Sequence, residues 1–96
     1  MTGLPGNVTP YKTTQAFTPE TVPAALLAMH RTKAGVWGRI DVLEGGLTVS
    51  RFADDGAPLR QDLLPAGTHA IVAPEEPHAV AFAQAGQFTV TFYKTP

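Results

Sequence analysis

The sequence contains no cysteine and a single serine, Ser50. Without cysteine the chain has no disulfide, no thiolate zinc site and no thiol nucleophile. Ser50 lies in a predicted β-strand without an accompanying histidine–aspartate pattern, which argues against a serine hydrolase. Glycine-rich phosphate loops, the dinucleotide-binding fingerprint and the HExxH zinc motif are also missing. Histidine, aspartate and glutamate are therefore the side chains left to hold a metal or to transfer a proton.

The sequence also lacks a cluster of like charges and a long hydrophobic run. Seven basic and eight acidic residues are scattered along the chain and give a net charge of −1. Without a basic patch, we expect no binding to nucleic acid or to an anionic membrane surface. The longest apolar run, residues 23–29, is too short to span a bilayer, and the amino terminus does not resemble a signal peptide. We therefore expect a cytoplasmic protein.

Glycine and proline, in contrast, are abundant, with nine of each in 96 residues. So many turn-forming residues exclude long helices and favour short strands joined by turns. The length suits a single domain over residues 1–96. Within it, residues 1–23 are rich in Pro, Gly and Thr and are expected to form an extended N-terminal lead-in. By helix propensity alone, residues 24–30 would form a short helix.

Alternation of apolar and polar residues predicts the strands of an all-β domain. The clearest case is the last one, in which Phe88, Val90 and Phe92 alternate with polar residues. Turns are expected at residues 43–46 and 53–57 and a hairpin at residues 85–86. The predicted strands are residues 36–42, 47–52, 59–64, 68–73, 78–82 and 87–93. Six or more short strands of this kind indicate a jelly roll or a small barrel.

The most specific local pattern ends at a histidine, His78. It begins at Gly67 and reads Gly-Thr-His-Ala-Ile-Val-Ala-Pro-Glu-Glu-Pro-His. This pattern resembles the second conserved motif of the cupin superfamily, in which a glycine, five residues, Pro-x-Gly and two more residues precede a metal-binding histidine. Ala73 and Glu75 stand at the Pro and Gly positions of that motif. His78 takes the position of the metal-binding histidine.

A second stretch, residues 42–49, resembles the end of the first cupin motif. The His-x-His and Glu that belong to that motif are not present in full here, so the usual three-His-one-Glu metal set is incomplete. His30, slightly upstream, is the histidine that this half of the pattern offers.

Nearly the whole chain resembles one cupin branch, most distinctively in the His-Arg-Thr-Lys-Ala-Gly-Val-Trp-Gly segment of residues 30–38. That branch is the small domain found alone in bacterial stress-response proteins and fused ahead of a methyltransferase in TehB-type tellurite-resistance proteins. The resemblance implies an all-β, cupin-type jelly-roll β-barrel. It also implies that residues 26–30 form a strand directed into the barrel rather than a helix.

The resemblance places His30 and His78 at a pocket, one from each motif. Two imidazoles suit a divalent transition metal such as zinc, nickel or iron. A stable site usually takes a third protein ligand, and both Glu75 and Glu76 are near His78 in sequence. We prefer Glu75, which holds a motif position. Each of these residues also has an ordinary interpretation, a hydrogen-bonded pocket histidine or a solvated acidic corner.

Lys33 and Trp37 are two further candidate contacts to a ligand. Lys33 could neutralise an anionic ligand or be an ordinary exposed lysine, and Trp37 could stack on a bound molecule or pack in the barrel. His69 begins a predicted strand and is expected to face solvent.

Three classes of function remain open from the sequence. The leading hypothesis is a metal-binding accessory protein for stress or for tellurite or other oxyanion resistance. The second is a metal-free module that binds a small polar or anionic molecule. The third is a metal-dependent enzyme such as a dioxygenase, for which no catalytic residue can be assigned. A homodimer is expected, because cupins often pair through sheet edges and the lead-in could pack across a dimer.

Overall fold

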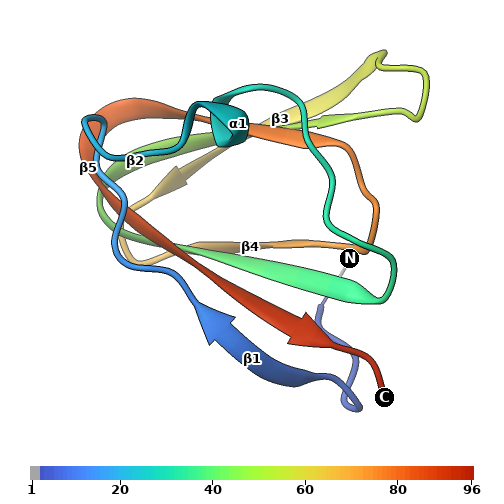
Figure 1. The fold of residues 1–96 in the computed structure, drawn as a ribbon. Coiled ribbons are helices and arrows are strands. Elements are labelled where there is room, and N and C mark those ends of the chain that lie inside the picture. The colour runs from blue at the N-terminus through green and yellow to red at the C-terminus, as the bar shows by residue number, and fades with distance from the viewer. Residues whose placement is uncertain (1–2) are drawn as a thin grey trace.

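A computed structural model describes residues 3–96 and shows five β-strands and one short helix (Figure 1). The elements are β1 (Thr9–Thr13), α1 (Ala24–Leu27), β2 (Val36–Phe52), β3 (Pro58–Pro65), β4 (His69–Val72) and β5 (His78–Lys94). The all-β prediction is confirmed. Within the described range, no helix is long and apolar enough to cross a membrane.

The strands belong to one antiparallel sheet in the order β1-β5-β2-β3, and β4 pairs with another part of β2. β1 and β3 are the two ends of this path, and residues 3–96 show no pairing between them. The sheet is therefore open. The closed jelly-roll barrel expected from the resemblance is not formed by this strand pairing.

Two long strands replace four of the predicted short ones. β2 and β5 pair along most of their lengths, and the turns expected at residues 43–46 and 85–86 are bends within these strands. At the bend the register shifts three times between Val42 and Leu47, and Gly45 has a φ of +72°. The glycines permit a sharp change of direction, but the two strands bend at the same place and so stay paired. That is why the turn and hairpin predictions here were wrong.

The bend divides the sheet into two layers with the core between them (Figure 1). One layer contains β3 with residues 46–52 and 78–84, and the other contains β1 and β4 with residues 36–44 and 87–94. The largest fully buried side chains are Phe88, Leu47, Val49 and Val72. Apolar side chains from both layers thus meet across the interior, as in a sheet-on-sheet core.

The N-terminal segment is more than an extended lead-in. β1 pairs with the end of β5, and Phe17 is 8% exposed and forms a backbone bridge with Phe88. The N–H of each of these two residues donates to the carbonyl of the other, at 2.8 and 3.1 Å. The lead-in therefore adds an edge strand and one core residue. Neither was predicted, because the Pro, Gly and Thr content of this segment indicated only an extended chain.

The segment before His30 is helical at its start and extended at its end. α1 covers Ala24–Leu27, so the helix expected from propensity is formed in part and the strand expected over residues 26–30 is not. Ala28 is already extended, with φ −99° and ψ 162°. His30 then makes an isolated antiparallel bridge with His78. The helix ends after one turn because the chain extends to reach β5.

Candidate functional site

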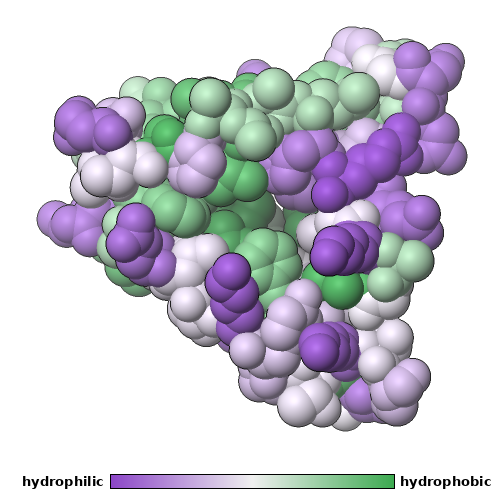
Figure 2. Space-filling model, viewed as in Figure 1, coloured by the Kyte–Doolittle hydropathy of each residue, from purple (hydrophilic) through white to green (hydrophobic). Residues whose placement is uncertain are grey.

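A cavity of about 560 Å³ lies between the two layers and opens on the face shown in Figure 2. The hollow has hydrophobic residues inside it and hydrophilic residues around its mouth. Its volume is in the range of pockets that bind small molecules.

The interior of the cavity is apolar and comes mainly from the two long strands. Val36, Gly38 and Ile40 line it from β2 because alternate residues of a strand face the same side. The interior residues from β5 are Val80, Phe88, Val90 and Phe92. Phe17 packs edge-on against Phe88 with ring centroids 5.6 Å apart, which closes one wall.

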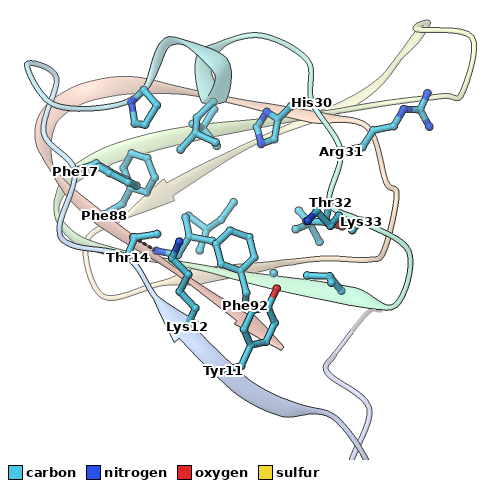
Figure 3. A pocket seen from close by; sticks show the side chains of 18 residues that line it. Tyr11, Lys12, Thr14, Phe17, His30, Arg31, Thr32, Lys33, Phe88 and Phe92 are labelled. Atoms are coloured by element: carbon cyan, nitrogen blue, oxygen red, sulfur yellow. Dashed lines mark hydrogen bonds between the residues drawn. The ribbon is translucent and has the colours of Figure 1, made fainter. Parts of the chain in front are cut away.

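The mouth of the cavity is basic (Figure 3). Lys12 comes from β1, and three more basic residues come from the segment that follows α1. The basic residues are Lys12, His30, Arg31 and Lys33, and no Asp or Glu is among the described residues that line the cavity. Arg31 points away toward Asp54, with which it forms an ion pair of 3.2 Å. The described part of the chain shows no ion pair for Lys12 or Lys33.

His30 and His78 lie next to each other, and His30 is at the cavity. Their backbones exchange two hydrogen bonds of 2.9 and 3.0 Å, and their ring centroids are 4.1 Å apart. His30 Nδ1 is 2.9 Å from the Ala28 carbonyl and His78 Nδ1 is 2.8 Å from the Glu76 carbonyl. A carbonyl oxygen only accepts, so each Nδ1 is the donor and, in the neutral ring, each Nε2 keeps its lone pair.

The two histidines differ in exposure. His78 is only 3% exposed, and this burial lowers its pKa to about 4, although the hydrogen bond to the Glu76 carbonyl opposes the shift. His78 is therefore neutral at pH 7. His30 is half-buried and lines the cavity, which His78 does not. The resemblance placed both histidines at one pocket; the structure brings their rings together, but only His30 lines the cavity.

The two candidate third ligands do not complete a metal site. Glu76 pairs with Arg51 at 2.9 Å and accepts a hydrogen bond from the Ala73 N–H. Glu75 is exposed and has a φ of +61°. Among residues 3–96, no three His, Asp or Glu side chains form a group that could hold a metal ion. Among the described residues, His30, His78 and Glu75 are therefore not assembled into the predicted set.

The two predicted ligand contacts are separated by the sheet. Lys33 is exposed and lines the cavity mouth. Trp37 alternates with the inward residues of β2, pairs with Tyr93 of β5 and is not among the cavity residues. The structure does not bring Trp37 to the site.

Several cavity residues were not singled out from the sequence. They are in the N-terminal segment, whose composition indicated a lead-in, and are Tyr11, Lys12, Thr14 and Phe17. Thr14 Oγ1 accepts a hydrogen bond of 3.0 Å from the Val90 N–H, which fixes this segment against β5. The Tyr-Lys pair, an aromatic residue next to a cation in a turn-rich stretch, is the signal that could have indicated their role.

The fold and the site define a small all-β domain in which one bent antiparallel sheet encloses an apolar cavity with a basic mouth. The family model for the TehB-like domain matches residues 12–90, and the chain belongs to that family.

Solved structures agree with this family. A crystal structure of a protein from E. coli (strain K12) superposes with a TM-score of 0.92 at 26% identity and covers 100% of this chain and 99% of the other. TehB from Haemophilus influenzae superposes with a TM-score of 0.87 at 25% identity, covering 94% of this chain and 32% of TehB. This chain thus corresponds to about a third of TehB. No curated protein sequence matches it significantly.

Proposed function

We propose that this TehB-like domain binds a small organic anion in its cavity, without a metal. The observation that carries the proposal is the basic mouth over an apolar interior, with no acidic side chain among the described lining residues. The protein as a whole has a net charge of −1, so this local excess of positive charge is not a consequence of composition. Uncompensated cations at the entrance of a low-dielectric cavity attract and hold an anion.

The apolar interior narrows the class of anion. An inorganic oxyanion could contact Lys12 and Lys33 but would leave the space between Phe17, Phe88 and Phe92 unfilled by apolar atoms. A carboxylate on an aromatic or aliphatic body would place its charge at the mouth and bury its hydrocarbon part, at about 25 cal/mol per Å² of apolar surface. The family resemblance suggests a role in resistance to tellurite or another oxyanion. The binding experiment therefore includes inorganic anions, so that their affinity can be compared with that of the organic ones.

Neutralising the two mouth lysines should weaken binding of an organic anion. We expect K12Q and K33Q each to raise the Kd of a benzoate or hexanoate probe about tenfold, the effect of losing about 1.4 kcal/mol of charge-assisted contact. Isothermal titration calorimetry of the full chain, with benzoate, hexanoate, phosphate and tellurite as separate probes, measures this.

The matched control is K94Q, which makes the same change of charge at a lysine outside the cavity lining. Lys94 lies 4.5 Å from the Tyr11 ring centroid, on the same part of the sheet as β1. K94Q should leave the Kd within about twofold, well under the tenfold that 1.4 kcal/mol represents. Equal effects of K12Q, K33Q and K94Q would contradict the proposal. Tellurite binding more tightly than both organic probes would replace the organic anion with an oxyanion.

A second candidate function, metal binding, is favoured by the His30–His78 pair. Histidine ligands of metals usually donate their second ring nitrogen to a carbonyl or carboxylate, and both Nδ1 atoms here do so. The pair supplies two nitrogen ligands for zinc, nickel or iron, and water would complete the set.

Metal content of the untagged protein tests this second candidate. If the histidine pair is a metal site, the wild type should retain about one equivalent of metal after incubation with Zn²⁺, Ni²⁺ or Fe²⁺ and desalting. H30A and H78A should lose it, because a structural site rarely survives with one ligand. K12Q/K33Q should leave the metal content unchanged, since neither lysine is a ligand. A wild type that binds no metal rejects this candidate without affecting the first.

The cupin relationship is also a proposal, supported by the corner before β5. Glu75 takes the position that is Gly in the cupin motif and adopts the positive φ that a glycine favours. A positive φ at this position is compatible with a motif that has glycine there, and this supports the proposal.

A further inference from the structure

β3 is an end strand of the sheet and carries the most exposed large apolar side chains of the described chain. One side of β3 pairs with β2, and its other side has no strand partner among residues 3–96 (Figure 1). Leu59 and Leu63 are 66% and 68% exposed. Exposed leucines on a free strand edge are a ready surface for pairing with another strand.

The exposed segment of β3 is symmetric about Gln61. It reads Leu59, Arg60, Gln61, Asp62, Leu63, so that leucines and then opposite charges stand at equal distances from the centre. Arg60 and Asp62 lie on the same face of the strand and are 2.8 Å apart within the chain. Two such strands that run antiparallel about an axis at Gln61 would place each Arg60 opposite the Asp62 of the other copy.

The backbone hydrogen bonds of β3 alternate in the way that this arrangement requires. Leu64, Asp62 and Arg60 pair with Leu47, Val49 and Arg51 of β2. The Ala66 N–H donates to the Gly45 carbonyl at 3.1 Å in the same register. Because hydrogen-bonded pairs alternate along an antiparallel ladder, the even-numbered residues bond to β2 and Gln61 and Leu63 direct their N–H and C=O groups outward.

We propose that β3 is a homodimer interface, in which a second copy of this chain pairs antiparallel about a two-fold axis at Gln61. The two Gln61 residues exchange backbone hydrogen bonds, and Arg60 of each copy faces Asp62 of the other. The Arg60–Asp62 pair is then a non-hydrogen-bonded pair of the ladder, and side chains in such pairs lie close together. Leu59 of each copy covers Leu63 of the other. The register shift between Arg51 and Phe52 limits the regular edge to Arg60–Pro65, so the interface is small and the dimer is weak.

The symmetry of the charges favours a second copy over an unrelated partner. A strand with the same charge at both positions would repel itself, which is how many proteins protect an edge. Here the opposite charges attract only if the other strand carries them in the inverted order. A second copy of this segment, lying antiparallel, carries the two charges in that inverted order.

Two charge reversals, studied apart and together, test the proposal. R60D makes the edge of β3 acidic and D62R makes it basic. Sedimentation equilibrium of the full wild-type chain should show a monomer–dimer equilibrium between about 1 μM and 1 mM. Each variant alone should dimerise at least about tenfold more weakly. Their equimolar mixture should form a heterodimer, detected by native mass spectrometry, because each acidic position then meets a basic one.

Both variants lose the ion pair between Arg60 and Asp62 within the chain. Restored association in the mixture would therefore come from contacts between the two copies. L63S, which leaves the charges intact, should also weaken the dimer, whereas L43S, at a leucine 50% exposed on β2, should not. Circular dichroism verifies that each variant is folded. A wild type that is monomeric at 1 mM, a dimer that R60D, D62R and L63S leave unchanged, or a mixture that associates no better than its components would overturn the proposal.

Discussion

Replacing Gly86 with alanine is expected to lower the free energy of unfolding by about 3 kcal/mol and the Tm by roughly 15 °C. Gly86 lies where β5 crosses the bend of β2. An added Cβ would overlap the carbonyl of Glu44 and lie 2.7 Å from the Gly45 nitrogen. These are backbone atoms held by strand pairing, so they cannot move aside as a flexible side chain could. The bend that creates the two layers would have to open.

The neighbouring Gly46 supplies a matched control. Its added Cβ would meet Gln84 Cβ at 3.7 Å, which is an ordinary contact. Urea unfolding followed by tryptophan fluorescence should therefore show a loss for G86A and a change of less than about 1 kcal/mol for G46A. Equal stabilities of G86A and G46A would mean that the close crossing at Glu44 does not constrain the fold.

Lowering the pH from about 6.5 to about 4 is expected to remove about 3 kcal/mol of stability through His78 alone. In the unfolded chain His78 takes up a proton near its ordinary pKa of 6.5. In the native state burial keeps it neutral until about pH 4. The unfolded state therefore binds more protons within this window, and stability falls as the pH falls. Above pH 6.5 and below pH 4 this contribution no longer changes.

Denaturant unfolding of metal-free protein at several pH values measures the effect. H78N keeps a side-chain N–H for the Glu76 carbonyl but does not titrate, so its stability should depend less on pH across the window. H69N is the control, since His69 is exposed at the start of β4 and should retain the wild-type pH dependence. If H78N and the wild type lost the same stability between pH 6.5 and pH 4, the burial of His78 would not be the cause.

The strand faces could be predicted from the sequence because their cause is local. Phe88 and Val90 alternate with polar residues, and each faces the core as the alternation predicts. The continuity of β2 and β5 could not be predicted. Gly45 and Gly86 are ordinary turn signals, and only the simultaneous bend of the partner strand lets each chain continue through them.

The site was also predictable in part, although not from local alternation. The pairing of His30 with His78 came from motif positions and the family resemblance, and the structure brings the two rings together. The third ligand depended on the backbone conformation of one corner residue, Glu75. At Glu75 the positive φ directs the chain differently from an extended strand, and sequence spacing does not reveal this. Lys12 was overlooked because β1 lies in a segment without a strong alternating pattern.

The sequence by itself determined that this protein is a small all-β domain whose strands have one apolar face. Turn density, alternation and motif spacing are properties of neighbouring residues, and they survive without a fold. Only the tertiary structure decided that the sheet is bent and open, that the N-terminal segment supplies Lys12 and Phe17 to a cavity, and that no described acidic residue lines it. These features arise where segments distant in the sequence meet, and the approach of β1, β2 and β5 in space sets which charges share one cavity.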